Sequence, residues 1–219
     1  GEGRVIEAEI FVAGGKPAVR SFLPGMTATQ SLSIGMPWSA FMDLPAIPQS
    51  PAPSGLRIAA WARPFTPMVA FSSPGTTGYA ARLLLPRAAV AGTLVTPLAS
   101  GRPGRWNHLA VIEMQLFSGS LSSSAELLVL GGANAAAVKS ANGMWEVIQF
   151  AKAEETGPGA WRLSGLLRGQ LGTEDAAALG AMPGSEFVLL DGAVLSAGLS
   201  DEESGLVLAR AGMDLERGG

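Results

Sequence analysis

The sequence predicts an all-β protein, built from antiparallel sandwich or barrel units with Gly/Pro-rich loops and little helix. The first observation behind this prediction is that 29 glycines and 15 prolines stand among 219 residues. That is about a fifth of the chain, against a usual value of about 12%, and too many helix breakers for a protein of long helices. The second is spacing, because apolar runs of strand length alternate with Gly/Pro/Ser turns roughly every 8–12 residues, as in sandwiches and barrels.

The first half of the chain is expected to form short strands broken by proline-rich segments. Residues 4–12 alternate partly, which predicts a half-buried strand that ends at Gly14-Gly15, and residues 18–23 are expected to pair with it. Closely spaced prolines exclude a helix around residues 44–54, which we interpret as a linker or a crossing segment. Further strands or apolar stretches are predicted at 56–62, 67–71, 79–85 and 88–98.

The second half carries clearer strand patterns. Residues 105–117 alternate well, and the apolar run ELLVL at 126–130 is predicted as a strand. Asn142-Gly143 is typical of a tight hairpin turn. The runs 144–153 and 160–167 are expected to pair as an antiparallel hairpin across the loop at 154–159. The remaining expected elements are a helical turn at 174–179 with Thr173 as its N-cap, and strands at 186–192 and 206–210.

Composition and charge exclude several classes of activity. The chain has no cysteine and one histidine, which excludes disulfides, thiolate chemistry and poly-histidine metal sites. A net charge of −3 argues against a dedicated nucleic-acid binder. No apolar run reaches the roughly 18 residues of a membrane-spanning helix. The chain begins Gly1-Glu2-Gly3 without a start Met or a signal segment, which indicates a fragment or a trimmed chain.

The candidate catalytic residues lack the partners that their chemistry needs. His108 could be a general base, but no GxSxG nucleophile motif accompanies it, so we expect a surface or strand-edge histidine. Acidic residues occur in sets adjacent in sequence rather than as two groups facing each other across a cleft, as glycoside cleavage requires. We interpret these sets as solvated charge: Glu154-Glu155, Glu174-Asp175 and Asp201-Glu202-Glu203.

Aromatic and basic side chains leave two interpretations open. The tryptophans could stack on sugars, but packing in the core and the hairpin is the favoured interpretation. These rings are Trp38, Trp61, Trp106, Trp145 and Trp161. In the predicted hairpin, Arg162 and Arg168 are expected to pair with Glu146 or Glu154.

Residues 21–100 carry unusually little charge. Their charged residues are Asp43, Arg57, Arg63, Arg82 and Arg87, five in eighty positions. A soluble surface usually carries more, so we expect much of this stretch to be covered, either by another chain or by the strands at 105–190. An assembly interface is preferred over an unusually large internal core.

Three blocks of the sequence resemble one family. NGMWEVIQFAKAEETGPGAWRLSGLLRGQLGTE at 142–174 closely resembles the C-terminal part of the large tail-tip protein of alphaproteobacterial gene transfer agents and of related siphophage tail proteins. TLVTPLASGRPGRW at 93–106 and VLGGANAAAV at 129–138 are similar to the same family, and FMDLP at 41–45 resembles the junction after its tail-hub domain.

The resemblance implies a structural role in a virion-like particle, at the tail tip or baseplate hub, in tail assembly and host-cell attachment. It implies further copies of the chain in a threefold hub, neighbouring tail proteins, and a host glycan or receptor as partners, with no nucleic acid and no membrane span. Assembly would take place in the bacterial cytoplasm. Residues 1–44 would end a preceding tail-hub β domain, and 45–219 would form a C-terminal β-rich domain.

No enzymatic activity is expected, because the family offers no catalytic, cofactor-binding or metal residues at matching positions. Its TIM-barrel-like region, which is often described as a glycoside hydrolase, has no eightfold βα counterpart in this chain. The alternative functions are a β-sandwich module that binds a cell-surface polysaccharide and, least supported, an enzyme that acts on surface glycan.

Overall fold

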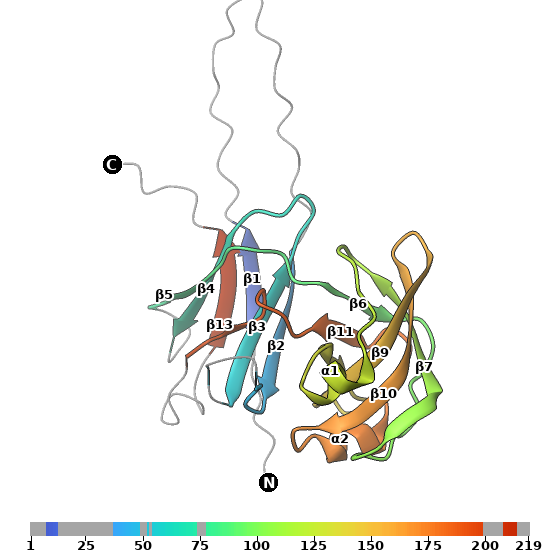
Figure 1. Cartoon of the computed structure of the whole chain (residues 1–219). Coiled ribbons are helices and arrows are strands. Elements are labelled where there is room, and N and C mark those ends of the chain that lie inside the picture. Colours follow the sequence, from blue (N-terminus) through green and yellow to red (C-terminus); the bar gives the residue numbers. More distant parts are fainter. Residues whose placement is uncertain are drawn as a thin grey trace, which may run out of the picture.

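The computed structural model describes residues 8–12, 37–48, 52, 54–73, 78–198 and 208–213. Its strands form one closed barrel and two further sheets (Figure 1). Strand makes up 51% of the structure and helix 7%, so the predicted all-β class is confirmed.

The second half of the chain closes into a six-stranded antiparallel barrel with the strand order β10-β7-β6-β11-β8-β9. The strands are β6 (Ala91–Leu94), β7 (Trp106–Leu116), β8 (Ala135–Lys139), β9 (Trp145–Gly157), β10 (Ala160–Gln170) and β11 (Glu186–Leu189). The predicted hairpin is confirmed as β9 and β10, whose ladder continues to the pair Gly157 and Ala160. The loop is therefore shorter than the six residues expected. The turn at Asn142-Gly143 joins β8 to β9, and Gly143 takes a φ of 88° there.

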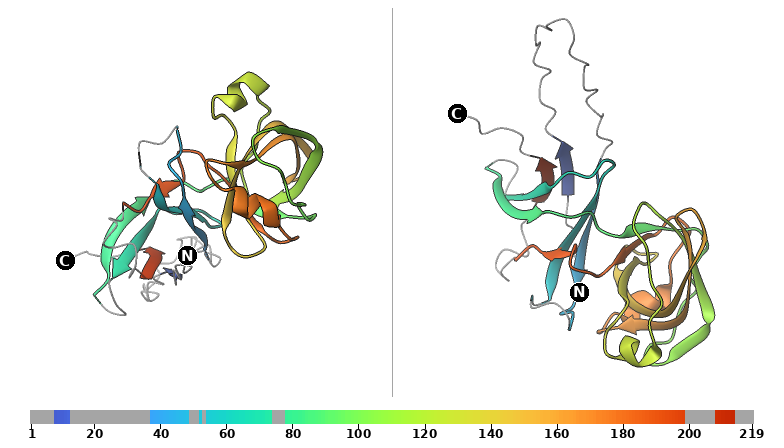
Figure 2. Two further views of the ribbon diagram at one scale, coloured as in Figure 1. Left: turned by 90° about the horizontal axis from the view of Figure 1, so that it is seen from below. Right: turned by 45° about the horizontal axis from the view of Figure 1, so that its top comes forward.

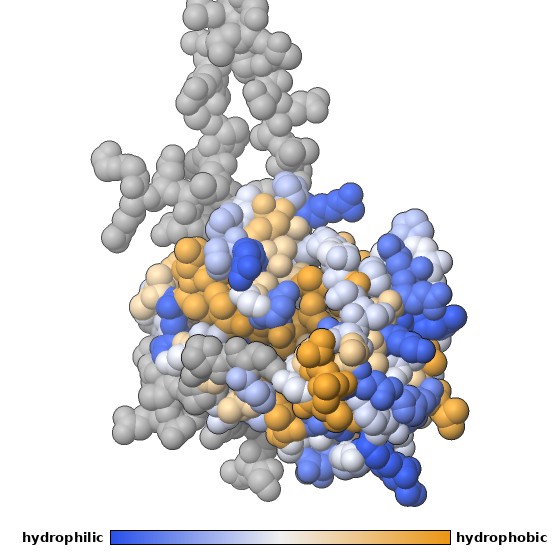
Figure 3. Space-filling model, viewed as in Figure 1, coloured by the Kyte–Doolittle hydropathy of each residue, from blue (hydrophilic) through white to orange (hydrophobic). Residues whose placement is uncertain are grey.

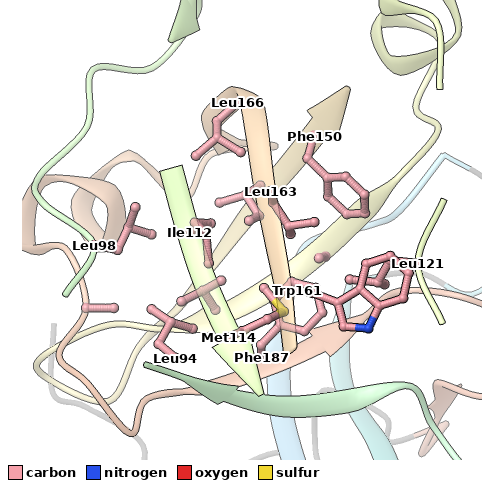
Figure 4. Packing of buried hydrophobic residues seen from close by; sticks show 14 of the residues in the cluster. Leu94, Leu98, Ile112, Met114, Leu121, Phe150, Trp161, Leu163, Leu166 and Phe187 are labelled. Atoms are coloured by element: carbon pink, nitrogen blue, oxygen red, sulfur yellow. The ribbon is translucent and has the colours of Figure 1, made fainter. Parts of the chain in front are cut away.

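Side chains fill the inside of this barrel (Figure 4). Alternate residues of each strand point inward, as in small barrels generally. The inward residues of β7 and β9 include Ile112, Met114, Ile148 and Phe150, all essentially without exposed surface. Leu121, from the segment after β7, packs into the same cluster beside Trp161. The interior is thus a core.

Strands from the first part of the chain and two strands from its C-terminal part form two smaller sheets. One has the order β1-β13-β4-β5, and the other has the order β12-β3-β2. Their strands are β1 (Ala8–Val12), β2 (Trp38–Leu44), β3 (Gly55–Trp61), β4 (Met68–Ser73), β5 (Ala80–Leu85), β12 (Leu195–Ser196) and β13 (Leu208–Met213). β1 and β13 pair in parallel, which brings two segments from opposite ends of the chain side by side.

Strand β3 lies between two cores, and this explains much of the charge-poor stretch. Ile58 and Ala60 pack into a cluster with Met68 and Leu85 of the β4–β5 sheet. Ala59, which points the opposite way, packs into a cluster with residues of the barrel wall. Both views in Figure 2 show β2 and β3 between the other sheet and the barrel. The barrel therefore covers one face of the described β2–β3 pair, and the β4–β5 sheet covers the other, while the preferred assembly interface for residues 21–100 stays a prediction.

The predicted strand at 126–130 is wrong, because these residues form the short helix α1 (Glu126–Leu130). An uninterrupted apolar run has no period that separates helix from strand. The surroundings of the segment decide its conformation. Only Val129 of α1 is buried against the barrel, and Gly131 ends the helix as its C-cap residue. The second helix, α2 (Glu174–Leu179), lies where it was expected. Thr173 precedes it without capping it, because its hydroxyl accepts a hydrogen bond from the Val147 N–H and donates one to the Gln170 carbonyl.

The proline-rich segment connects two neighbouring strands of a single sheet. β2 and β3 pair along their whole length, from Trp38 opposite Trp61 to Leu44 opposite Gly55. The expected boundary between residues 44 and 45 thus falls at the end of β2, and the division into two domains stays a prediction. The expected turn at Gly14-Gly15 and the strand at 18–23 lie outside the described residues.

Candidate functional site

The acidic sets stand apart from one another in the fold. Glu154 and Glu155 are exposed at the far end of β9, and Glu174 and Asp175 occupy the first turn of α2. Asp201, Glu202 and Glu203 lie outside the described residues. Within the described part of the chain, no group of three or more histidine or acidic side chains could hold a metal ion.

His108 is exposed on β7 and contacts two side chains. Its ring stacks on Trp106 with a centroid distance of 5.8 Å, and its Nδ1 lies 4.0 Å from Glu126 Oε1 at the start of α1. Its side chain is 61% exposed. The expected surface location is confirmed.

All five tryptophans pack against the protein itself. Trp38 and Trp61 both lie against Phe117, with ring centroids 5.3 and 5.2 Å away. Trp145 and Trp161 are buried, and Trp106 packs over the small cluster beneath α1. Each ring thus has packing partners within the chain, while Trp38, Trp61 and Trp106 keep part of their surface exposed.

The two hairpin arginines have different partners. Arg168 pairs with Glu146, as expected, but Arg162 pairs with Glu113 of β7 at 2.9 Å instead of with a residue of β9. Arg162 lies opposite Glu113 in the β10–β7 ladder and opposite Glu154 in the β10–β9 ladder, and its guanidinium pairs with Glu113. This second pair is on the surface, with both side chains more than a third exposed.

The Arg168–Glu146 pair lies inside one end of the barrel. Both side chains are 1% exposed, and Arg168 Nε and Nη2 donate to the two oxygens of Glu146, the latter over 2.8 Å. Arg168 Nη1 also donates to the Ala99 carbonyl, and Glu146 accepts the Gly169 N–H, each over 3.0 Å. A bidentate pair with these extra bonds satisfies the charges that burial removes from water. The pair fills this end of the barrel interior with hydrogen-bonded polar side chains.

The joint between barrel and sheets combines apolar and polar contacts. Trp145 of the barrel donates its indole N–H to the Phe41 carbonyl of β2. Glu186 on β11 accepts hydrogen bonds from Trp38 Nε1 over 3.2 Å and from Lys139 Nζ over 2.9 Å. These hydrogen bonds accompany an apolar cluster to which both the β2–β3 sheet and the barrel strands contribute side chains.

The surface carries a group of exposed leucines on α1, and a further exposed leucine on β7. Leu127, Leu128 and Leu130 of α1 are 80%, 61% and 63% exposed, and Leu109 of β7 is 95% exposed. We call the three leucines of α1 the leucine patch. Figure 3 shows hydrophobic colour over α1. Contiguous exposed apolar surface on a soluble protein commonly marks a binding site.

The helix that carries three of these leucines is held firmly against the barrel. Val129 is fully buried against Ala151 and Leu167. The Gln149 carboxamide donates to the Val129 carbonyl and, over 3.0 Å, to the Ala133 carbonyl. Asn134, with a φ of 53°, donates to the Ser122 and Phe150 carbonyls. These bonds fix both ends of the α1 segment.

A separate contact raises Leu109 from β7. The Asn107 carboxamide oxygen accepts the N–H groups of Leu109 and Ala110 over 3.1 and 2.9 Å. This Asx-type turn interrupts regular pairing with β10, whose register shifts at this point. Sequence reasoning missed the leucine patch because ELLVL was predicted as a strand. The signal available was an apolar run flanked by Ser122–Ser124 and Gly131-Gly132.

None of the helices in the described part of the chain has the length and apolar character to cross a membrane.

Comparison with protein families matches residues 89–188 to a family described as Rcc01698-like, C-terminal. That family is associated with the gene transfer agent of Rhodobacter capsulatus. The match begins two residues before β6 and ends within β11, so it coincides with the closed barrel. It covers a little under half of the chain. Comparison with curated proteins finds no match.

Proposed function

We propose that this chain is a structural part of a phage-like tail tip, in the baseplate hub of a gene transfer agent, where it serves tail assembly and host-cell attachment. The observation that carries the proposal is the coincidence of the family match with the barrel. The longest block of the resemblance, residues 142–174, also lies within the barrel and spans β9 and β10.

The construction of the barrel supports a structural role. Its interior is filled by apolar side chains, and one end is closed by the Arg168–Glu146 pair. A closed, filled barrel has no free strand edges and little freedom to deform, so it suits a rigid part of an assembly. The joint to the β2–β3 sheet extends this rigid body into the first half of the chain.

The proposed partners are further copies of the chain in a hub, neighbouring tail proteins, and a glycan or receptor on the host surface. The proposed location is the tail tip of a virion-like particle that is assembled in the bacterial cytoplasm. In this role the chain performs no catalysis and needs no cofactor.

The test is to tag the chain in a producing cell and to purify the particles. Mass spectrometry should find the chain in intact particles, and gold-labelled antibody should mark the tail tip in electron micrographs. Replacing Leu163, a fully buried core residue, by Asp should abolish particle infectivity. The matched replacement of its exposed neighbour Arg162 by Gln should not. Particles that lack the chain, or label distributed over the capsid, would contradict the proposal.

A glycan array tests the glycan-binding alternative. If a polysaccharide were held by tryptophan rings, a glycan array probed with the purified chain would give a signal that Trp106→Ala removes. We expect no such loss, because Trp106 is covered by His108 on one side and packs on the cluster of Val129, Ala151 and Leu167.

A further inference from the structure

We infer that Asn142 is a latent modification site, which deamidates through attack by the Gly143 backbone nitrogen in the unfolded chain and which the folded turn protects through Ser140. The inference concerns the chemistry of the turn between β8 and β9 and does not rest on the proposed function. It is carried by the Asn-Gly sequence, by the exposure of both residues, and by three hydrogen bonds that meet at the turn.

The sequence and the open surroundings of Asn142 favour the reaction. The chain has three asparagines, and Asn142 is the one that a glycine follows. Both Asn142 and Gly143 are exposed, so water reaches the carboxamide. Gly143 has a φ of 88°, and no atom lies within 4 Å of the point where a side chain would begin. Because glycine carries no side chain, its nitrogen is the easiest backbone nitrogen to bring against a neighbouring carboxamide.

The reaction takes up one water and releases one ammonia. A peptide nitrogen is a poor nucleophile until it loses its proton, because its lone pair is delocalised into the carbonyl group. Once deprotonated by solvent base, the Gly143 nitrogen forms a bond to Asn142 Cγ, and the Nδ2 group leaves with a proton as ammonia. Water then opens the five-membered imide. Attack at Cγ gives aspartate, and attack at the backbone carbonyl carbon gives isoaspartate, in which the chain runs through Cβ and Cγ.

The folded turn opposes the first step in two ways. The Gly143 N–H donates to the Ser140 carbonyl over 2.9 Å, and a nitrogen that lost this proton would face the lone pairs of that oxygen. Asn142 Oδ1 accepts the Ser140 hydroxyl over 2.7 Å and the Met144 N–H over 3.1 Å. Rotation of the side chain about its Cα–Cβ bond breaks both bonds, so the carboxamide is not free to search for the geometry of attack.

Ser140 is the residue on which this protection depends. Its side chain is buried, and its hydroxyl also lies 2.9 Å from the Met144 carbonyl, to which its own N–H donates over 2.7 Å. Ser140 directly follows Lys139, the last residue of β8, which pairs with Trp145 at the start of β9. The barrel ladder thus holds Ser140, and Ser140 holds the carboxamide of Asn142.

The product would disturb one end of the barrel. An isoaspartate at position 142 adds a backbone atom to the turn that sets the β8–β9 register. The residues just beyond the turn are Trp145, which donates to the Phe41 carbonyl of β2, and Glu146, which pairs with Arg168. Protection of Asn142 therefore preserves the register on which both contacts depend.

The experiment follows Asn142 in the full 219-residue chain, incubated in mildly alkaline buffer made with water enriched in heavy oxygen. Trypsin in ordinary water then releases residues 140–152, because Lys139 and Lys152 flank them. Mass spectrometry measures the converted fraction, and fragmentation places the label at residue 142. The unstructured reference is a synthetic peptide of residues 140–152. It should convert at least roughly tenfold faster than the folded chain, because it lacks the hydrogen bonds of the turn.

Variants assign the protection to Ser140. Ser140→Ala should speed conversion of the folded chain roughly two- to tenfold, the range that one ordinary hydrogen bond corresponds to, and Ser140→Thr should restore protection because it keeps a hydroxyl. The matched control is Ser123→Ala, since the Ser123 hydroxyl also bonds to β9, donating to the Ala153 carbonyl over 3.2 Å. This control should convert at the wild-type rate. Asn142→Gln should convert far more slowly than the wild type, because attack would have to close a larger ring.

Circular dichroism and urea unfolding of each variant show how much of it is folded during the incubation. A peptide that does not convert overturns the site, and a peptide that converts no faster than the folded chain overturns the protection. Equal rates for Ser140→Ala and the wild type, or equal acceleration by Ser123→Ala, overturn the role of Ser140. These readouts come from the isolated chain, so failure of this inference is distinguishable from failure of the proposed function.

Discussion

Replacing Arg168 by Met should destabilise the chain far more than the same replacement at Arg162. Both arginines lie on β10 and both pair with a glutamate, but the Arg168 pair is 1% exposed on each side and the Arg162 pair is 48% and 39% exposed. Removing one partner of a buried pair leaves an uncompensated charge in the core, which costs about 3–5 kcal/mol. Removing a partner of a solvent-exposed pair costs about 0–1 kcal/mol.

The magnitude at Arg168 has a second contribution from hydrogen bonding. Arg168 also donates to the partly buried Ala99 carbonyl, which the variant leaves without that donor. The unpaired Glu146 keeps only the bond from the Gly169 N–H. For a protein of this length, 3–5 kcal/mol corresponds to a decrease in melting temperature of roughly 6–20 °C. Arg162→Met should change it by less than about 4 °C.

The assay is urea unfolding followed by tryptophan fluorescence, with calorimetry for the melting temperatures. The double variant Glu146→Gln with Arg168→Met should be more stable than Arg168→Met alone, because it removes the unpaired charge and keeps an acceptor for Gly169. Equal losses at Arg168 and Arg162 would refute the reasoning, since burial would then make no difference. A double variant no more stable than the single one would show that the loss comes from packing instead of charge.

Three further predictions concern the barrel and its attachments. Gly180→Ala should destabilise the chain by well over 1 kcal/mol in urea unfolding, because Gly180 has a φ of 66° and a Cβ there would lie 2.3 Å from the Leu98 carbonyl oxygen. The control Gly184→Ala should cost only about 1 kcal/mol, because Gly184 has a φ of 83° but no atom within 4 Å of an added Cβ. Gln149→Ala should speed hydrogen exchange of the α1 amides with a loss of about 1–3 kcal/mol, and unchanged exchange would contradict the anchoring role. Trp145→Phe keeps an aromatic ring between the barrel and the β2–β3 sheet but loses the hydrogen bond to β2. Calorimetry should show a loss of about 0.5–1.5 kcal/mol of stability. No loss would show that this hydrogen bond does not stabilise the contact between barrel and sheet.

Several elements could be predicted from the sequence because their information is local. The hairpin of β9 and β10 follows from two strand-type runs around a Gly/Pro turn, and α2 follows from its acidic first turn after Thr173. Glu146 was one of the two partners predicted for Arg168, because both Glu146 and Glu154 lie on the neighbouring strand of the same hairpin. In each case the interacting residues are close in sequence, and the turn sets their register.

The tertiary structure decided the features that depend on residues distant in sequence. Closure of the barrel brings β7 beside β10, which pairs Arg162 with Glu113 and places the Arg168–Glu146 pair inside the barrel instead of on a surface. Placement of β3 between two cores depends on the barrel and on the β4–β5 sheet together.

The run ELLVL shows the same division most clearly. Its residues are apolar, and this alone favours burial. Its conformation and exposure depend on Gln149 and Asn134, which hold the backbone so that only Val129 enters the barrel wall. Local sequence determines how well a segment forms strand or turn, but long-range contacts determine which face is covered, and thus where the exposed leucines gather.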